Sequence, residues 1–458
     1  MTEKETNDLM LIEKLHKMLK AGNRTLNHYP YLIKAALLVK LAVTLANKET
    51  GALCPDKADA IEKACRLALE DLSKVDIPIN IYRSMGAPLN LAISDYLARA
   101  ASTDTLTVTR DDLLINQADA DVTATIKTLV VRECITPLLE AGHWFADLMD
   151  TKANEFKDVV KTSRSNLRDG LPVSLGDEFK AYSVTLRESL ESLKQNQLTW
   201  NESAFGLGEA GTGLGSTRAF QKAANAALSQ LAGFELQAPA NALVGLDGAQ
   251  KLVLTHAHIQ SIALVLWKTA HDLGLLCSGP RGGIREIAFP AVAPGSSIMP
   301  GKINPTVAEL AMLVSDNILS NHWASTLGVH SGWLGAAPSS TLPVKTLMDS
   351  SDLLARTLKI FGTKVIQGIT AFPDRALKQA QSSLALAHAL DYFCTKEDRL
   401  KVQDLAKKQN LTCLQAAKEL KVLPDDALDE ILNPANLINA DQVEKVLLRF
   451  ADLRRETK

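Results

Sequence analysis

The sequence predicts an all-α fold built from long helices, and two observations carry that prediction. Apolar residues recur every three to four positions through long stretches that few glycines or prolines interrupt. Alternating runs rich in β-branched residues, which are typical of strands, are scarce. The chain has 458 residues, of which 46% are hydrophobic and 22% charged, the ordinary balance of a globular protein. That composition excludes a wholly disordered or collagen-like chain.

Five stretches each have room for a helix well above the usual mean length of about 11 residues. They are 134–162, 177–203, 250–277, 307–328 and 342–370. The 250–277 stretch carries apolar residues such as Ile259, Leu264 and Trp267 on several faces, which favours burial against other subunits. Only short runs such as Thr105–Thr109 indicate a strand.

Charge density rises after about residue 390, and the amphipathic segments there become shorter. We therefore divide the chain into an N-terminal helical domain (1–132), a central long-helix domain (133–390) and a small C-terminal helical domain (391–458). No internal repeat interrupts this organisation.

Charge and cysteine use exclude several classes of partner. With 50 basic and 52 acidic residues the formal net charge is −2, which gives no general attraction to nucleic acid or to an anionic membrane. No long uncharged apolar run or secretory signal is present, so we expect no membrane partner. The six cysteines are scattered without a C-x-x-C pair, which predicts reduced thiols in a cytoplasmic protein with no metal site.

The most informative segment is a loop, 279–305, rich in glycine and proline between two helical stretches. Within it, Gly295–Pro305 combines glycines that allow close approach to a ligand with a proline that can begin a helix at Thr306. The free N–H groups at that helix start suit an anion, and Lys302 and Asn304 add a charge and an amide donor. A polar surface turn has a similar composition, so this pattern alone leaves both interpretations open.

Gly295–Pro305 resembles the signature of the fumarase/aspartase superfamily. The resemblance extends over about residues 20–440. Its other parts are Ile81–Ala98, Ser163–Pro172 with Gly176–Phe179, Gly211–Leu214, and Lys268–Arg281 with Glu286 and Ile287.

This resemblance implies a homotetramer whose central domains pool their long helices in one bundle. Each active site is then built by three chains, with one sequence block from each. The implied reaction is a reversible β-elimination from a small carboxylate substrate, usually releasing fumarate, with no metal or organic cofactor.

By resemblance, Ser296 is the general base that removes a proton next to a carboxylate. Such a hydroxyl works as a base only as an alkoxide held by N–H donors and a nearby cation. Lys302 and Asn304 match the residues that bind the carboxylate and stabilise the extra charge of the intermediate. Glu309 matches a carboxylate that polarises the residue facing the leaving group. Ser297 and Met299 of the same motif are expected to bind substrate.

The second active-site block departs from the family pattern. Where the family has Gly-Arg-Thr followed by His or Gln, this chain has Ser163, Arg164, Ser165 and Asn166. Ser165 still offers a hydroxyl to the substrate, and Asn166 offers an amide. Asn166 cannot shuttle a proton near neutral pH, so the Glu–His pair of the hydratases is absent.

The first block departs further, because most hydroxyls expected to hold a second substrate carboxylate are missing. Asn90 and Asp121 are the surviving polar candidates, and Asp119 would repel a carboxylate. We hypothesise that Asp119 and Asp121 receive a cationic amine, so that the substrate differs from malate and aspartate.

These departures favour a carbon–nitrogen lyase that releases ammonia or an amine, since an ammonium group carries its own proton. Two alternatives stay open. One is a fumarate hydratase-type carbon–oxygen lyase, and the other is an inactive superfamily member with a binding or structural role. His256 and His258, two apart on a helix, point to different sides and cannot easily share a metal, so we interpret His256 as structural or inter-subunit.

Overall fold

The computed structural model describes residues 25–77, 79–292, 295–299, 301–330 and 340–454, and it confirms the all-α fold of long helices. The chain divides into two compact units, each made of three segments. The first unit comprises Met1–Ala141, Ser189–Leu264 and Val314–Arg356, and the second comprises Gly142–Glu188, Val265–Leu313 and Thr357–Lys458. The predicted division into domains at 132/133 and 390/391 stays a prediction.

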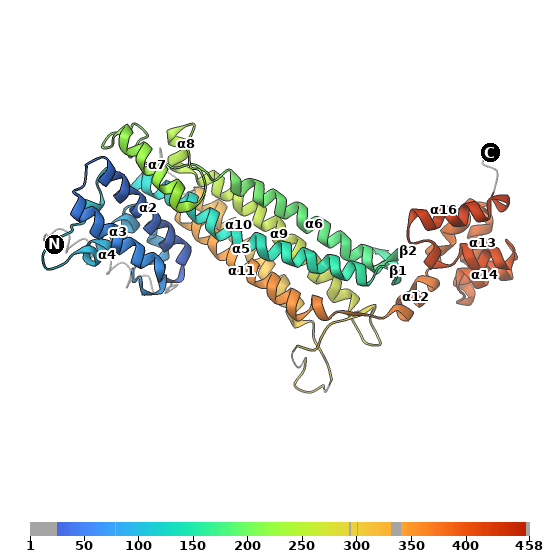
Figure 1. Cartoon of the computed structure of the whole chain (residues 1–458). Helices are drawn as coiled ribbons and strands as arrows, with labels where there is room; N and C mark the ends of the chain where they lie inside the picture. The colour runs from blue at the N-terminus through green and yellow to red at the C-terminus, as the bar shows by residue number, and fades with distance from the viewer. Residues whose placement is uncertain (1–24, 78, 293–294, 300, 331–339, 455–458) are drawn as a thin grey trace. The chain divides into compact units, whose positions relative to one another are not determined.

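Long helices occupy the stretches that the apolar periodicity predicts (Figure 1). They are α5 (Asp119–Glu155), α6 (Leu175–Leu198), α9 (Ala249–Leu276), α10 (Thr306–His330) and α11 (Thr341–Lys364). Their lengths run from 24 to 37 residues. Thr306 begins α10 directly after Pro305, as expected for a proline at a helix start.

The first unit also contains shorter helices. They are α2 (Pro30–Glu49), α3 (Pro55–Glu70), α4 (Ala87–Ala101), α7 (Arg218–Ala232) and α8 (Ala242–Asp247). Among the described helices, α2 alone is long and apolar enough to cross a membrane, but 78% of its apolar window is buried. It contacts α3, α4 and α7, so within the unit it is a core helix.

A buried polar cluster joins three long helices within the first unit. His256 on α9 is completely buried, and its Nε2 lies 3.0 Å from the Ser350 hydroxyl on α11. The Asn321 amide on α10 donates to the same hydroxyl at 3.1 Å. The rings of His256 and His322 lie 5.4 Å apart. His256 is therefore part of the packed interior, and burial lowers the pKa of its imidazole to about 4.

The second unit is held by apolar and polar contacts between its helices. Phe145 of α5 stacks on Phe361 of α11, with ring centroids 5.9 Å apart. Gly362 brings the α11 backbone against the Trp144 ring, where an added Cβ would lie 2.5 Å from that ring. The Tyr182 hydroxyl on α6 donates to Asp272 of α9 at 2.9 Å.

A β-hairpin in the second unit corrects one helix boundary of the sequence analysis. Residues 160–162, predicted as the end of a helix, belong to β1 (Val160–Ser165), which pairs antiparallel with β2 (Arg168–Ser174). The helix α5 ends at Glu155. β1 packs on α12 (Pro373–Ser382), and β3 (Ile287–Ala288) pairs with β4 (Thr370–Ala371).

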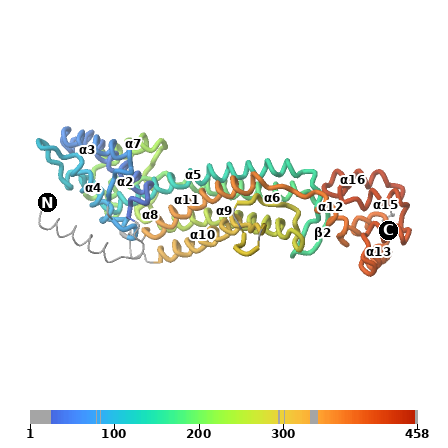
Figure 2. Tube along the Cα trace, turned by 90° about the horizontal axis from the view of Figure 1, so that it is seen from below, coloured from blue at the N-terminus to red at the C-terminus, as the bar shows by residue number. Residues whose placement is uncertain are grey.

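The C-terminal helices lie close together (Figure 2). They share an apolar core of their own. They are α13 (Lys396–Gln409), α14 (Cys413–Glu419), α15 (Asp425–Ile431) and α16 (Ala440–Arg449). Leu390, Val402 and Leu428 are fully buried in this core. Short 3-10 helices complete the described chain at Leu26–His28, Leu72–Lys74, Ile81–Arg83, Asp111–Leu113, Ile366–Gly368, Leu384–Tyr392, Pro434–Asn436 and Ala451–Leu453.

The predicted strand at Thr105–Thr109 is wrong, because the segment is irregular in the structure. Side chains take the backbone donors that a strand would pair. The Leu106 N–H donates to the Thr103 hydroxyl at 3.1 Å, and the Thr109 N–H donates to the Asp112 carboxylate at 2.8 Å. Threonine and aspartate thus form local turns in place of a ladder.

The buried His256 predicts a pH-dependent stability. Because its folded pKa of about 4 lies below its unfolded value, protons bind the unfolded chain more readily between pH 4 and 6.5. Stability is therefore lost as the pH falls. Relative to His256→Gln, the wild type should lose about 2 kcal/mol of unfolding free energy between pH 7 and pH 5, measured by urea unfolding. The control is His258→Gln, since His258 is partly exposed. If the wild type lost as much stability relative to His258→Gln as relative to His256→Gln, the low pKa assigned to His256 would be contradicted.

Candidate active site

The signature loop is closed on itself by backbone and side-chain hydrogen bonds. The Gly295 N–H donates to the Lys302 carbonyl at 2.9 Å, and the Asn304 amide donates to the Gly295 carbonyl at 3.0 Å. A Cβ at position 295 would lie 2.5 Å from the Lys302 carbonyl oxygen, so only glycine fits there. Pro300 of the motif lies outside the described residues. The predicted carboxylate binder Asn304 thus fixes the loop in this form.

The hydroxyl oxygen of Ser296 sits on two backbone donors inside this loop. The Ile298 N–H donates to Ser296 Oγ at 3.2 Å, and the Met299 N–H donates to it at 3.1 Å. Two N–H groups aimed at one oxygen stabilise negative charge on that oxygen more than on the neutral hydroxyl. The loop therefore provides the kind of environment that an alkoxide base requires.

The other candidates of the motif lie at the protein surface. Ser297, Met299 and Lys302 are exposed, and so is Glu309 in the first turn of α10. Among the described residues, the Lys302 ammonium and the Glu309 carboxylate have no ion-pair partner. Both groups are consequently available to a ligand or to another chain.

The second-block candidates form the tip of the β1–β2 hairpin. Ser165 pairs with Arg168 across a two-residue turn made of Asn166 and Leu167, both exposed and both with positive φ (49° and 60°). Asparagine tolerates this left-handed conformation better than most residues. Asn166 is therefore well suited to present its amide from the tip of the hairpin.

A buried ion network anchors this hairpin, and the sequence analysis gave its members no structural role. Glu286 is fully buried, and its carboxylate contacts Arg164 at 2.7 Å and Lys161 at 3.2 Å. Lys161 also pairs with Glu178 at 2.6 Å, and Arg164 donates to Gln379 of α12 at 3.0 Å. The two cations and two carboxylates balance each other. Only the presence of Arg164 and Glu286 in the family-like blocks hinted at the network.

The first-block candidates lie in the first unit. The Asn90 amide donates to Asp119 at 2.7 Å, while its carbonyl oxygen is buried and has no hydrogen-bond partner among the described residues. Asp121 is 1% exposed and accepts backbone N–H bonds from Ala118 and Gly208, both at 3.1 Å. Burial raises the pKa of Asp121 to about 7. Asp121 thus ties together two backbone segments, and Asp119 and Asn90 present acceptor oxygens.

A buried lysine supports this first block and was missed from the sequence. Lys40 of α2 is 1% exposed and donates to the Gln117 side chain at 2.8 Å and to the Leu113 carbonyl at 3.0 Å. Burial lowers the pKa of its ammonium to about 7. Nothing in an otherwise apolar helical stretch marks this lysine as more than a surface residue.

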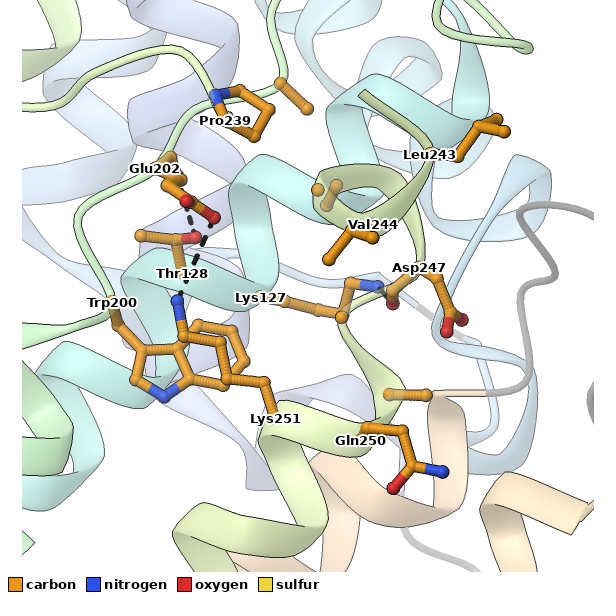
Figure 3. A pocket seen from close by; sticks show the side chains of 15 residues that line it. Lys127, Thr128, Trp200, Glu202, Pro239, Leu243, Val244, Asp247, Gln250 and Lys251 are labelled. Carbon is orange, nitrogen blue, oxygen red and sulfur yellow. Dashed lines mark hydrogen bonds and ion pairs between the residues drawn. The ribbon is translucent and has the colours of Figure 1, made fainter. Parts of the chain in front are cut away.

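A separate hollow of about 450 Å³ in the first unit contains none of the predicted site residues (Figure 3). The Lys251 ammonium lies 4.7 Å from the centre of the Trp200 ring and 3.9 Å from Glu202. Lys127 is held by the Leu246 and Asp247 carbonyls and by Ser340, so its donors are already used. Burial lowers the pKa of Lys127 to about 8. Both lysines of this hollow are thus already in contact with protein groups.

The structure therefore gathers the candidates into three groups. Ser296, Ser297, Met299, Lys302 and Asn304 share one loop that Glu309 follows, and Ser165 and Asn166 share one hairpin tip. Asn90 and Asp121 belong to the first unit. Among the described residues of the second unit, no hydrogen bond joins the hairpin tip to the loop. No group of three or more His, Cys, Asp or Glu residues that could hold a metal occurs in the described parts of the chain.

Comparison with known proteins places this arrangement in a family. The family described as Lyase matches residues 13–320. The aspartate ammonia-lyase of Pseudomonas aeruginosa is 31% identical over 426 residues, which cover 90% of this chain and 89% of the relative. The class II fumarate hydratase of Halalkalibacterium halodurans is 28% identical over 417 residues, which cover 89% and 90%.

Solved structures agree with the sequence relatives. The fumarate lyase:delta crystallin of Brucella melitensis, bound to cobalt, has a TM-score of 0.88 at 30% identity and covers 92% of this chain and 93% of its own. The class II fumarase of Schistosoma mansoni has a TM-score of 0.84 at 25% identity and covers 89% and 90%. The chain therefore belongs to the Lyase family. It is a lyase of the fumarase/aspartase superfamily, and the family implies a small carboxylate substrate.

The buried network predicts a large effect for one substitution. Glu286→Ala leaves Lys161 and Arg164 with unbalanced charge in a dry site. It should lower the unfolding free energy of the second unit by about 3–5 kcal/mol, measured by urea unfolding. Glu397→Ala breaks a pair whose carboxylate is 78% exposed and should cost at most about 1 kcal/mol. Equal effects of the two substitutions would contradict the structural role of Glu286.

Proposed function

We propose that this lyase breaks a carbon–nitrogen bond by reversible β-elimination, releasing ammonia or an amine and an α,β-unsaturated acid such as fumarate. The observation that carries the proposal is the pair of backbone N–H groups on Ser296 Oγ. They support Ser296 as the base that removes the proton next to the substrate carboxylate.

Charge develops on that carboxylate as the proton leaves, and Lys302 is the cation of the loop that faces it. Asn304 joins it when loop closure breaks the hydrogen bond between its amide and the Gly295 carbonyl. Closure also excludes water, which strengthens both contacts. Ser297, Met299 and Ser165 then hold the substrate. Glu309 polarises the residue that faces the leaving group.

The leaving group follows from the first and second blocks. The Asn166 amide cannot act as an acid near neutral pH, so it cannot protonate a departing hydroxide. An ammonium group needs no such acid, because it leaves as a neutral amine. The Asn90 carbonyl oxygen has no partner among the described residues, and the Asp119 carboxylate already accepts from the Asn90 amide; both are acceptor groups, which supports binding of a cationic amine. Asp121 supports this site by holding the backbone at Ala118 and Gly208 through two hydrogen bonds.

A hydratase is the second candidate, because class II fumarate hydratases resemble the chain nearly as closely as aspartate ammonia-lyases do. An inactive binding or structural protein is the third. The retention of Ser296, Lys302, Asn304 and Glu309 in one motif supports an active enzyme over this last alternative.

The proposed assembly is a homotetramer in which three chains contribute to each site. The exposed hairpin tip, the exposed loop and the unpaired Lys302 and Glu309 support completion by other chains. Apolar side chains left in solvent on α10 support pooling of the long helices, for example Leu313 (67% exposed), Trp323 (70%) and Leu327 (59%). The six cysteines are all free, which supports a cytoplasmic location.

A substrate screen tests the reaction. Amino acids, amines paired with fumarate, and hydroxy acids are followed at the ultraviolet absorbance of the conjugated acid. We expect turnover with an amino-acid substrate and little with malate, and efficient use of malate would instead establish the hydratase. Aspartate should also be a poor substrate, since the first block lacks most of the hydroxyls expected to hold a second carboxylate and offers acceptor oxygens instead.

The screen identifies the substrate on which Ser296 is then tested. Ser296→Ala should lower kcat by about 10²–10⁴-fold with little change in substrate binding, because it removes the base and leaves the carboxylate contacts. The hydroxyl of Ser297 lacks these two N–H contacts, so Ser297→Ala is the matched control for kcat; as a substrate-binding residue, Ser297 should affect KM instead. An unchanged kcat in Ser296→Ala would eliminate Ser296 as the base.

The assembly is tested by charge on the exposed α10 face. Trp323→Glu combined with Leu327→Glu should convert a tetramer into smaller species in light scattering and should abolish activity. Leu400→Glu on α13, 46% exposed in the C-terminal helices, should leave the mass unchanged. A monomeric wild type with full activity would refute the shared site.

A further inference from the structure

A polar cleft in the second unit lies apart from the signature loop. It has a volume of about 740 Å³ and is formed by α12, the β1–β2 hairpin and the turn Ser278–Ile284. Figure 1 draws the hairpin next to α12, and β1 packs on that helix. The mechanism proposed above uses none of the residues that line this cleft.

The lining of the cleft carries a small excess of positive charge. Arg164, Arg375 and Lys378 line it together with one carboxylate, Asp169, and the charge of Arg164 is balanced by the buried Glu286. Lys378 is exposed in the middle of α12 and has no hydrogen bond or ion pair from its ammonium among the described residues. The excess charge makes a small anion the complementary ligand.

The two arginines are held in place by the protein. Arg375 donates through Nε to the Ile284 carbonyl at 2.8 Å and through Nη2 to the Gly283 carbonyl at 2.6 Å. Arg164 donates through Nη2 to Glu286 at 2.7 Å and to Gln379 at 3.0 Å. Both guanidinium groups are thus fixed at the wall of the cleft before a ligand binds.

The turn leaves room for such a ligand. At Gly283 an added Cβ would lie 2.4 Å from the Ser278 carbonyl, which shows how tightly the turn is folded. At Gly282 an added Cβ would meet no atom within 4 Å, so this side of the turn opens on free space. The glycine backbone thereby lets a ligand approach the fixed arginines.

We propose that this cleft binds a small multivalent oxyanion, a phosphate or a carboxylate, as an effector at a site separate from the catalytic loop. Arg164 precedes Ser165 at the hairpin tip, and the turn 278–284 leads into the signature loop. An anion bound between α12, Arg164 and the turn would therefore hold together the two segments of the unit that carry candidate catalytic residues.

Binding is measured on the full-length protein by isothermal titration calorimetry at constant ionic strength. Sodium phosphate and sodium citrate are the two probes, and they distinguish a phosphate ligand from a carboxylate ligand. We expect at least one of them to bind the wild type, about tenfold more weakly to Lys378→Met, and more weakly still to Lys378→Glu. The matched controls Lys445→Met and Lys445→Glu, in the middle of exposed α16, should bind as the wild type does.

Hydrogen exchange locates the bound anion. When the anion is added to the wild type, the protection of backbone amides from exchange should rise in residues 278–286 and in α12. The same addition should cause a smaller rise in Lys378→Glu. The proposal is overturned if neither probe binds at millimolar concentration, if Lys378 and Lys445 variants bind alike, or if protection appears only elsewhere. Ser296→Ala should retain anion binding, so this result is independent of whether the proposed elimination reaction is correct.

Discussion

The fully buried carboxylate of Glu286 is the contact on which the second unit depends. It contacts Arg164 at 2.7 Å and Lys161 at 3.2 Å. Glu286, which precedes the Gly295–Pro305 motif in the same loop, is thereby tied to two positions of β1. A buried charge of this kind is stable only while its partners remain in place. Through Gln379 the same network reaches α12. The position of the Asn166 hairpin and the start of the 279–305 loop therefore follow from one set of ion pairs.

The two halves of the candidate site differ in how they are built. The loop half is self-contained, since Gly295, Asn304 and the two N–H groups on Ser296 all bond within the same segment. The proposed recognition half is spread over the hairpin tip, α4 and the start of α5, where Asn90 of α4 and Asp119 of α5 present acceptor oxygens. In the proposed mechanism, proton removal and substrate choice therefore rest on separate structural elements. Such a separation would allow substrate specificity to change while the chemistry of the loop persists.

The sequence predicted what periodicity and local chemistry determine. The long helices were found because their apolar spacing continues over many turns, and Pro305 marked the start of α10 because proline suits a helix N-terminus. The hairpin was missed because Lys161, Arg164 and Arg168 break the alternation that marks a strand. The burial of Lys40, Lys127 and Lys161 could not be predicted, because it depends on partners far along the chain. The acceptors are 73 or more residues away for Lys40 and 119 or more for Lys127, and Lys161 pairs with Glu286. The Thr105–Thr109 strand failed because nearby Thr and Asp side chains satisfy its backbone.

In the proposed enzyme, Ser296 works in a cleft that several chains build together. A crystal structure of the assembled protein with a bound carboxylate tests this arrangement most directly. We expect Ser296 and Lys302 of one protomer to face Asn166 of a second and Asn90 of a third across one closed cleft. A structure with Lys302 and Asn304 in bulk solvent, away from every other protomer, would contradict it.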